Sequence, residues 1–577
     1  MAVALPGTTV RLYEKADKKG VNPGLRLDRF CDVGNQERQH AELRKVVELE
    51  GDGECLKAVA QRRTGALAAL PDLSNWTMKT VGPLTLHLSR PSVLENAGIC
   101  LHPIYGFAYL PGSGLKGMAR AYAETVWLHE PQQQKDDKAA WEKIEDVFGR
   151  APNLDRKRCI ADDNPPAHRR LASRGGQEVE LKACAGSVVF HDAWPTSWPG
   201  LRVDIVNCHH KAYYEKGEPP GDWESPSPSY FLAVKSGATF EFAIASRGGA
   251  ASAESLGLAR EWLTGALYHL GAGAKTNAGY GRFTVADGPG PVVPQPLLST
   301  SCEIRLASPA FLAGSEQQQE EDCRLRTATL RGLLRWWWRT MYAGQVSVAV
   351  IRSLEGTVFG DTNAGGALSL SLEPMGEHRA KKFDFKDGYG VKKSFLAEHV
   401  LVRPPAGRMS GFLYLAYGMD ESKKGVKAQR WFLPHRTGWR VVLTARPGTF
   451  VENRDQLPKM RAHHQAPAPQ VPAAVVLRQA QAALGLLCRF GGVGAKCRKG
   501  YGSLELTDPA DWGSDEFVEA AARDLLAKCG LQARANSAEL PATSSCLTQH
   551  RIAPVEVATP WSDPWSALDQ LGLAYQE

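Results

Sequence analysis

Gly271-Ala-Gly-Ala-Lys-Thr-Asn-Ala-Gly-Tyr-Gly281 is repeated, 221 positions later, as Gly492-Val-Gly-Ala-Lys-Cys-Arg-Lys-Gly-Tyr-Gly502. We call these stretches loop 1 (271–281) and loop 2 (492–502). Seven of their eleven positions are identical, including Lys275 with Lys496 and Tyr280 with Tyr501. A long internal repeat determines the architecture of a chain before any local pattern does. This repeat indicates two copies of one domain, each carrying the same glycine-rich loop.

Two shorter matches occur in the same order along the chain. Leu115-Lys-Gly-Met-Ala-Arg120 matches Leu330-Arg-Gly-Leu-Leu-Arg335, and Val147-Phe-Gly149 matches Val358-Phe-Gly360. A segment with four prolines and two glycines, 287–296, excludes helix or central strand between the copies. The sequence therefore predicts copy one at residues 1–286, a linker at 287–298 and copy two at 299–577.

Length and composition agree with this division. The 577 residues exceed what one hydrophobic core usually supports, and 43% of them are hydrophobic. The net charge of +7 is only mildly basic, so the location of the charge must decide whether nucleic acid is a partner. The twelve cysteines form no CxxC pair, and no run of eighteen apolar residues occurs. We expect a soluble cytoplasmic protein with reduced thiols and no membrane contact.

The order of elements predicts the fold class. Each copy reads as strand, helix, strand, strand, helix and a glycine loop leading into a strand. This is the βαββαβ order of a ferredoxin-like α+β domain, here in tandem and with insertions. The expected strands are 85–89, 186–190, 239–244, 300–306, 367–372 and 412–416. The expected helices are 115–129, 254–270, 329–342 and 474–487, and the expected insertions are 151–184, 373–395 and 460–472.

The glycine loops permit two interpretations. Closely spaced glycines such as Gly271 and Gly273, or Gly492 and Gly494, allow successive backbone N–H groups to face a phosphate. The lysine would then add a charge, and the tyrosine a flat surface for a base or sugar. The alternative is a turn that joins a helix to the last strand. Retention of lysine and tyrosine in both copies favours the first interpretation, although the loops lack the P-loop pattern.

The helices that follow the first strands are basic. Lys116 and Arg120 lie four residues apart, hence on one face. In copy two, Arg331, Arg335 and Arg339 continue this spacing, with Arg324 and Arg326 before them, and no acidic residue lies between Asp322 and Met341. A solvated helix face normally mixes both signs of charge. Five arginines without an acid predict contact with phosphates or with a neighbouring subunit.

Candidate catalytic groups lack partners in the sequence. His209 and His210 have no adjacent acid or base motif, and Asp192, Asp361 and Asp384 show no metal-ligand spacing. We expect structural or RNA-contacting roles for them, no metal and no cofactor.

These features resemble the RAMP superfamily of CRISPR effector proteins. Copy one resembles the subunit-six family of the type III-B (Cmr) complex, and copy two the subunit-one family. The matching stretches of copy one are 110–117, Phe190-His-Asp-Ala-Trp194, Asp204 with His209-His210 and Tyr213-Tyr214, Ser225-Pro-Ser-Pro and 271–283. Those of copy two are Phe311-Leu-Ala-Gly314, 326–339, Val358-Phe-Gly-Asp361 and 490–502.

The resemblance implies a non-catalytic subunit at the end of an effector complex, holding the 3′ part of the CRISPR RNA and its target duplex. Its partners would be CRISPR RNA, target RNA and the RAMP backbone and small subunits. A RAMP endoribonuclease is the alternative, and a mononucleotide-binding regulator is disfavoured by the order of the elements. The predicted RNA-contacting residues are Lys116, Arg120, His209, His210, Gly271, Gly273, Lys275, Asn277, Tyr280, Arg282, Arg324, Arg326, Arg331, Arg335, Arg339, Gly492, Gly494, Lys496, Arg498, Lys499 and Tyr501.

Overall fold

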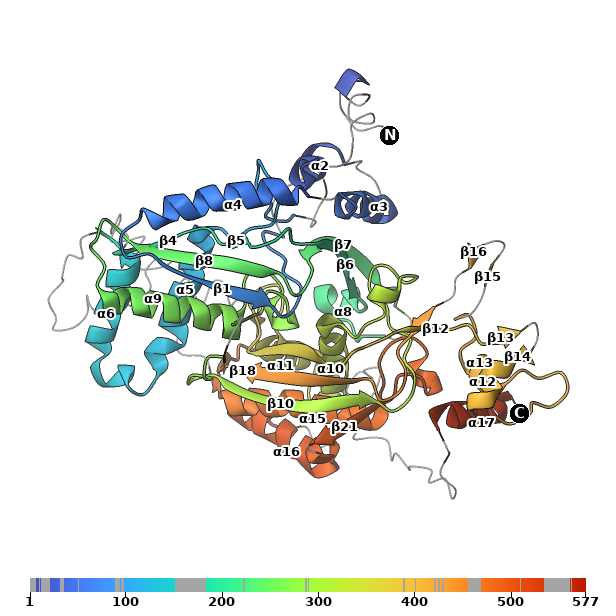
Figure 1. Ribbon diagram of the computed structural model, residues 1–577. Helices are drawn as coiled ribbons and strands as arrows, with labels where there is room; N and C mark the ends of the chain where they lie inside the picture. Colours follow the sequence, from blue (N-terminus) through green and yellow to red (C-terminus); the bar gives the residue numbers. More distant parts are fainter. Residues whose placement is uncertain are drawn as a thin grey trace.

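The computed structural model describes residues 7–9, 11 and most of 21–576, and its longest gaps are residues 12–20, 151–182, 455–468 and 534–560. It is a mixed α+β structure whose two main sheets are antiparallel. Figure 1 shows the sheets one above the other, with a smaller lobe around the C-terminus at the side. Most of the predicted insertions 151–184 and 460–472 lie outside the described residues.

Copy one is built on a sheet with the strand order β4-β8-β1-β9, to which β5 adds beside β8. Alternation in Thr239-Phe-Glu-Phe-Ala-Ile244 buries Phe240, Phe242 and Ile244 of β8 on one face, as period-two patterning requires. The strands are β1 (Ser74–Thr80), β4 (Val188–Phe190), β5 (Trp194–Pro195), β8 (Thr239–Ser246) and β9 (Phe283–Val285).

Helices α5 (Gly112–Thr125) and α9 (Ala253–Gly265) pack on this sheet, and α6 (Asp137–Phe148) packs against both helices. Leu115, Ala119 and Tyr122 recur at helical spacing along α5 and are buried. A second hairpin, β6 (Leu201–Cys208) with β7 (Ser227–Val234), carries the short helix α8 (Lys211–Lys216). The N-terminal helices are α2 (Pro23–Arg29), α3 (Gln36–Val47) and α4 (Gly53–Ala68), and α4 crosses the face of the copy-one sheet away from copy two (Figure 1).

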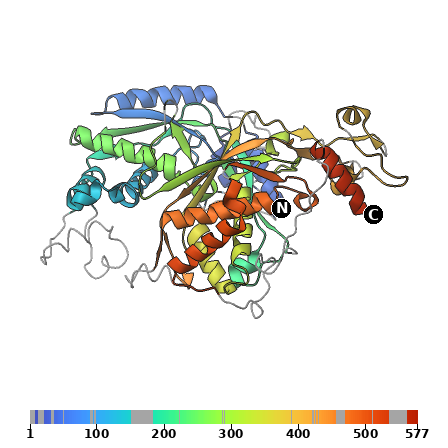
Figure 2. The same cartoon turned by 90° about the horizontal axis from the view of Figure 1, so that it is seen from below.

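Copy two repeats the arrangement with the strand order β11-β18-β10-β21. In both sheets the second and third strands pair at one side and the first and last at the other. Figure 2 shows α15 and α16 together on the side of copy two seen from below. The elements are β10 (Leu298–Leu306), α10 (Thr327–Tyr342), α11 (Val348–Phe359), β11 (Leu368–Met375), β18 (Gly438–Ala445), α15 (Ala473–Phe490), β21 (Leu504–Asp508) and α16 (Asp515–Lys528).

The C-terminal lobe has its own aromatic core. Phe383, Phe395, Phe412, Phe432 and Trp565 pack together there. Its helices are α12 (Lys393–Glu398), α13 (Gly411–Leu415) and α17 (Pro564–Gln576), with the short strands β12 (Lys381–Lys382), β13 (Lys386–Asp387), β14 (Gly390–Val391) and β17 (Trp431–Phe432). Two further small hairpins are β15 (Ser422–Lys423) with β16 (Val426–Lys427) and β19 (Gly448–Thr449) with β20 (Gln470–Val471).

Two predicted strands are wrong. Residues 85–88 form no strand, and Ser89 lies outside the described residues. The Thr85 carbonyl instead accepts a hydrogen bond from the Ala274 N–H of loop 1, and the neighbouring Leu84 makes an isolated bridge to Val234. Residues 412–416 are mostly helical in α13, where Phe412, Leu413 and Leu415 are buried. Tertiary packing against α17 overrides the alternating pattern there.

Candidate nucleic-acid interface

The two glycine loops have the same backbone geometry. Lys275 and Lys496 occupy the left-handed region, with φ of 60° and 62°. In loop 1 the N–H of Ala274 donates to the Thr85 carbonyl at 2.9 Å, and in loop 2 the N–H of Ala495 donates to Phe311 at 2.9 Å. The repeat is therefore a repeat of structure as well as of sequence.

Close packing explains why glycine stands at matching positions. A Cβ on Gly273 would lie 2.1 Å from the Thr85 oxygen, and one on Gly494 would lie 2.2 Å from the Phe311 oxygen. Neither oxygen can move without breaking the hydrogen bond to the loop. The glycines thus let each loop lie against the segment that follows the first strand of its own copy.

The prediction that the loop N–H groups face a phosphate is wrong for most of them. In loop 1 the N–H groups of residues 271, 272, 274 and 278–281 donate to backbone carbonyls of the same copy. In loop 2 those of residues 493, 495, 499, 500 and 502 do the same. The alternative interpretation, a turn joining a helix to the last strand, describes the backbone of both loops at these positions.

The loop tyrosines are core residues, which corrects their interpretation as surfaces for bases. Tyr280 is 3% exposed and its hydroxyl donates to Asp204 Oδ2 at 2.9 Å. Tyr501 is fully buried and donates to the Phe412 carbonyl at 2.7 Å. Burial, followed by the negative charge of Asp204, raises the pKa of Tyr280, so this hydroxyl keeps its proton.

Loop 1 lies against copy two. The side-chain amide of Asn277 donates to the Gly366 carbonyl at 3.1 Å, and its backbone carbonyl accepts from Arg331 Nη1 at 2.8 Å. A Cβ on Gly279 would lie 2.7 Å from the side chain of Thr327, the first residue of α10. The structure therefore brings loop 1 and the basic helix α10 together, as the sequence suggested. They pack directly against each other, so each covers part of the other's surface.

The arginine stripe of α10 surrounds a buried glutamate. Glu355 of α11 accepts from Arg335 Nε at 2.5 Å and from Arg339 Nη1 at 3.1 Å. It also accepts from the hydroxyls of Tyr213, at 2.7 Å, and Tyr214, at 3.1 Å, both in α8 of copy one. Burial alone would raise the pKa of Glu355, but these cations and hydroxyls outweigh it and lower the pKa to about 2.

A second buried carboxylate, that of Asp204, lies beside the arginines that precede α10. Asp204 Oδ1 accepts from Arg326 Nη1 at 3.0 Å, and the charge of Arg324 lies 3.9 Å from Oδ2. Burial opposes ionisation of Asp204, yet Arg202, then Arg326 and Arg324, hold its pKa below the ordinary value. Arg202 in turn pairs with Asp322 at 2.8 Å. We call Asp204, Glu355 and the arginines around them the charged junction.

The premise that the stripe lacks acidic partners is wrong. Its counterions lie outside the helix: Asp204 on β6 of copy one, Asp322 just before the arginines, and Glu355 on the next helix, α11. The hydroxyls of Tyr213 and Tyr214 from copy one also bind Glu355. Arg331 donates hydrogen bonds to the backbone carbonyls of Asn277, Leu368 and Phe359. Arg282 donates to the Tyr268 carbonyl and to the Ser369 hydroxyl. Seven arginines among the predicted RNA contacts have guanidinium groups that are engaged inside the protein or lie beside Asp204 and Asp322: Arg120, Arg282, Arg324, Arg326, Arg331, Arg335 and Arg339.

Other predicted contacts lie nearer the solvent. Arg498 and Lys499 of loop 2 are exposed, and Lys496 is half-buried. Lys275 is half-buried and sits over the Phe231 ring at 5.2 Å, and burial lowers its pKa. In copy one Lys116 is half-buried, and burial and the charges of Arg247 and Arg120 lower its pKa. A lysine beside like charges would gain from an added anion.

The histidines and aspartates have structural partners. His210 Nδ1 lies 3.2 Å from Glu224 Oε1, and His209 is exposed beside it. Asp361 accepts from the N–H groups of Asn363 and Ala364 at 2.8 and 2.9 Å and pairs with Arg454. Asp192 accepts from the N–H of Gly112, at the start of α5. Across the described residues, no three His, Cys, Asp or Glu side chains are grouped as metal ligands.

Comparison with known families decides the affiliation. The family model of the RAMP superfamily matches residues 77–284 and 303–462, more than half of the chain. The chain belongs to the RAMP superfamily. Its two matched segments fall within copy one and copy two, and the linker lies between them.

Relatives of this RAMP protein come from type III-B systems. CRISPR system Cmr subunit Cmr6 of Pyrococcus furiosus is 32% identical over 231 residues, 36% of this chain, and the chain spans 66% of that relative's length. The crystal structure of Cmr6 from the same organism is 30% identical over 37% of this chain and 98% of its own, with a TM-score of 0.21.

Two further structures are less similar in sequence. A type III-B Cmr-beta complex bound to cognate target RNA contains a chain 17% identical over 48% of this one and 86% of its own, with a TM-score of 0.29. The crystal structure of Cmr1 from Pyrococcus furiosus, in its apo form, is 15% identical over 48% of this chain and 71% of its own, with a TM-score of 0.28.

Family motifs of this RAMP protein reappear at the charged junction. Asp204, Tyr213 and Tyr214 belong to the stretch that carries the subunit-six resemblance, and all three lie between the copies. Sequence reasoning did not find Glu355, because a single acid in an apolar helix gives no local signal. None of the helices in the described part of the chain has the length and apolar composition needed to cross a bilayer.

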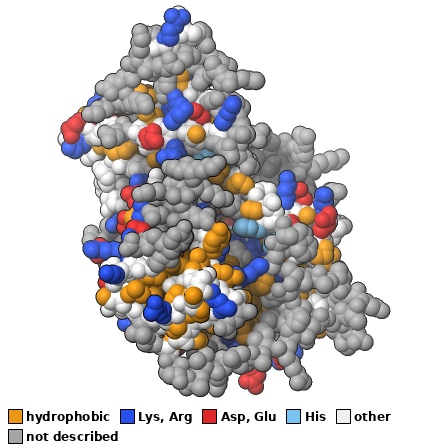
Figure 3. All heavy atoms as spheres, turned by 90° about the vertical axis from the view of Figure 1, so that its right-hand side faces the viewer, with side chains coloured by type: hydrophobic (Ala, Val, Ile, Leu, Met, Phe, Trp, Pro, Cys, Tyr) orange, Lys and Arg blue, Asp and Glu red, His pale blue; other side chains and the backbone are white. Residues whose placement is uncertain are grey.

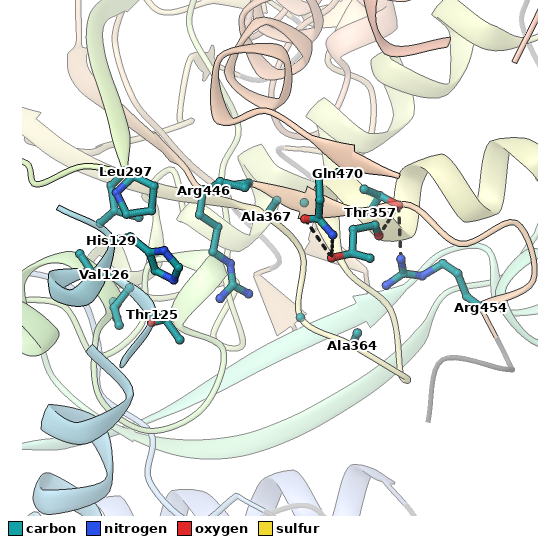
Figure 4. A pocket seen from close by; sticks show the side chains of 16 residues that line it. Thr125, Val126, His129, Leu297, Thr357, Ala364, Ala367, Arg446, Arg454 and Gln470 are labelled. Atoms are coloured by element: carbon teal, nitrogen blue, oxygen red, sulfur yellow. Dashed lines mark hydrogen bonds between the residues drawn. The ribbon is translucent and has the colours of Figure 1, made fainter. Parts of the chain in front are cut away.

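A cavity of about 410 Å3 also lies between the copies. Figure 4 shows that copy one lines one end of it and copy two the other, with Arg446 between them. Arg446 donates to the Gly366 carbonyl at 3.2 Å, and Arg454 is held by Asp361 and Thr357. These polar contacts all lie within copy two. The labelled side chains are Thr125, Val126, His129, Leu297, Thr357, Ala364, Ala367, Arg446, Arg454 and Gln470.

Proposed function

We propose that this chain is a non-catalytic, RNA-binding subunit of a type III-B CRISPR effector, in which a Cmr6-like and a Cmr1-like RAMP domain are joined covalently. It would act in the cytoplasm, in antiviral defence, at the end of the complex that holds the 3′ part of the CRISPR RNA and its target duplex. The family match in both copies and the 32% identity with Cmr6 over 231 residues support the assembly. The proposed partners are CRISPR RNA, target RNA and the other RAMP backbone and small subunits.

We propose a ferredoxin-like fold for each copy. The supporting observation is the strand order, β4-β8-β1-β9 and β11-β18-β10-β21, with a helix after the first strand and another after the third. This is the order that a βαββαβ chain gives when its second and fourth strands form the two edges. Both copies place their glycine loop directly before the last edge strand.

The observation that carries the RNA-binding proposal is the exposure of the cations in loop 2. Arg498 and Lys499 are exposed beside Lys496 on a turn whose backbone is rigidly hydrogen-bonded. A rigid turn holds such side chains at a fixed spacing, which suits contact with successive phosphates of a strand. Lys116 with its neighbour Arg247 is the second candidate contact. Contacts with the backbone alone would serve a guide of any sequence.

A non-catalytic role fits the partners of the candidate acids and bases. Asp361 is tied to Arg454, and His210 to Glu224. Neither arrangement leaves an acid and a base facing one open site. An endoribonuclease remains the alternative, since His209 is exposed beside His210.

Salt-dependent RNA binding tests the proposal. In the full chain, Arg498→Glu/Lys499→Glu should weaken guide binding and reduce the log–log salt slope by about 1.4, because each contact with a single strand contributes about 0.7. The matched control is Arg523→Glu/Lys528→Glu on α16, which changes the net charge equally at two exposed positions. An unchanged slope in the loop variant, or an equal loss in the control, contradicts the assignment of loop 2.

Cleavage assays test the non-catalytic role. His209→Ala/His210→Ala should leave target cleavage by the assembled effector unchanged once guide occupancy is matched. Loss of cleavage with full occupancy and full assembly would favour the endoribonuclease alternative.

A further inference from the structure

The two glycine loops are covered by different helices at the same glycine. Gly279 and Gly500 hold equivalent positions, each with a positive φ, of 81° and 85°. A Cβ on Gly279 would lie 2.7 Å from Thr327 of α10, and one on Gly500 would lie 3.1 Å from Leu568 Cδ2 of α17. The C-terminal helix therefore stands on loop 2 where the next RAMP domain stands on loop 1.

The apolar surroundings of the loop tyrosines show the same equivalence. Tyr280 packs with Phe231, and Ala328 of α10 covers that cluster. Tyr501 packs with Phe311, and Trp565 and Leu568 of α17 complete its cluster. In each copy, a helix from beyond the loop's own sheet buries the tyrosine. We call the contact of loop 2 with α17 the apolar junction.

Three contacts fix α17 in this place. Asp569, fully buried, accepts from the N–H of Val402 at 3.0 Å and from the N–H of Phe412 at 3.3 Å. Gln576 donates to the Met409 carbonyl at 3.0 Å. Lys499 lies over the Tyr575 ring at 4.9 Å. The helix is thus bound both to the loop and to α13, although residues 534–560 separate it in sequence from the rest of copy two.

We propose that α17 is a cap that closes loop 2 against docking of a further RAMP domain. The contact of loop 1 with α10 is a head-to-tail contact between RAMP domains, and α17 ends that series at the C-terminal side of this chain. This inference concerns assembly rather than RNA binding, and it is tested on RNA-free protein.

The geometry also identifies what the cap excludes. The surface under α17 fits a RAMP helix that begins with small residues, as α10 begins with Thr327 and Ala328. Helix α5 of copy one begins with Gly112 and Ser113, and Ser113 is exposed. Without the cap, α5 of a second chain can therefore dock on loop 2.

Figure 3 shows the face of the molecule that bears the lobe, where hydrophobic side chains gather among lysines and arginines. The outer side of α17 itself is only partly apolar, with Leu571 41% and Tyr575 63% exposed. It has no glycine loop of its own with which to receive another domain. The cap thus covers the docking surface of loop 2 and exposes in its place a helix surface without a glycine loop.

A cleavable cap tests the proposal. A protease site is placed within residues 534–559, the folded chain is cut, and Trp565→Ala/Leu568→Ala weakens the hold of the released helix. Light scattering after size exclusion should show concentration-dependent oligomers for the cut double variant and monomers for the uncut one. An excess of synthetic peptide 561–577 should restore the monomer. Leu571→Ala in the cut chain is the matched control on the exposed side of α17 and should stay monomeric.

A second substitution separates docking from aggregation. Ser113→Trp in the cut double variant should abolish the oligomers, because it blocks the start of α5. Oligomers that persist with this change would overturn the proposal, as would a folded chain that has lost α17 and stays monomeric at the highest concentration.

Folding is followed by circular dichroism while the peptide is diluted at constant chain concentration. We expect oligomers to appear with the fold of residues 298–530 retained. Unfolding of copy two on release would make α17 a core element rather than a cap and would also overturn the proposal.

Discussion

The two junctions use one loop geometry with opposite chemistry. At the charged junction, loop 1 and α8 meet α10 and α11 through two buried carboxylates and their arginines. At the apolar junction, loop 2 meets α17 through Trp565 and Leu568, and the tyrosine hydroxyl binds a backbone carbonyl. The loop therefore specifies where a helix docks, while the residues around it specify which helix.

This difference has an energetic consequence. Buried ion pairs cost much desolvation free energy and are not strongly stabilising as pairs, but removal of one partner leaves a buried charge. Apolar contacts have no such penalty and lose stability in proportion to the surface removed. The charged junction should thus respond most sharply to single substitutions, which suits a contact specific for one partner domain.

The largest expected effect comes from Glu355→Ala. Arg335 and Arg339 would lose their shared carboxylate in a buried place, and we expect a loss of about 3–5 kcal/mol in the free energy of unfolding. Chemical denaturation measures it, and Glu303→Ala is the control, because Glu303 forms an exposed pair with Arg305 whose contribution is about 0–1 kcal/mol. A loss at Glu355 no larger than at Glu303 would show that the charged junction is not rigid.

Acid should weaken the charged junction next. The pKa of Glu355 is lowered from its ordinary 4.5 to about 2. A depressed carboxyl pKa stabilises the fold above the unfolded value, and this contribution is lost as pH falls from 4.5 toward 2. The shift corresponds to about 3 kcal/mol. The difference in unfolding free energy between the wild type and Glu355→Gln should therefore shrink between pH 4.5 and 2, and a constant difference over that range would contradict the assignment.

The sequence predicted much of the frame and little of the junction. Repeated glycines, the positions of α5, α9, α10 and α15, and most sheet strands followed from periodicity and from the internal match. The partners of the arginines did not, because Asp204 lies in copy one and Glu355 lies on the next helix, both outside the segment that carries the arginines. A helix whose charges are all of one sign indicates a partner of opposite charge, but the pattern alone does not distinguish RNA from protein.

The packing of the C-terminal lobe could not be predicted from the sequence, for a related reason. Residues 412–416 alternate like a strand, and only contact with α17, about 150 residues later, makes α13 the better solution. Tyr280 and Tyr501 likewise match in sequence but differ in the acceptor that each finds. Local identity fixed their burial, and long-range partners determined their chemistry.

The loop tyrosines compare the two junctions directly. Tyr280→Phe removes a hydrogen bond to a carboxylate, which is worth about 1.5–3 kcal/mol, whereas Tyr501→Phe removes one to a backbone carbonyl, worth about 0.5–1.5 kcal/mol. Both rings stay buried, so the cavity effect is the same. We expect the first change to lower the unfolding free energy by the larger amount. Equal losses would mean that Asp204 is satisfied by its arginines alone.

The smallest effect is expected where a charge meets the apolar junction. Lys499 lies over the Tyr575 ring at 4.9 Å, and both side chains are exposed. An exposed cation–π contact contributes about 0.5–1 kcal/mol. Lys499→Met and Tyr575→Leu, singly and together, form a double-mutant cycle read by hydrogen exchange of α17 amides, which reports local opening of the cap. We expect a coupling of this size at low salt. A coupling near zero would show that the Lys499–Tyr575 contact does not hold α17 in place, so that Lys499 could bind RNA without loosening the cap.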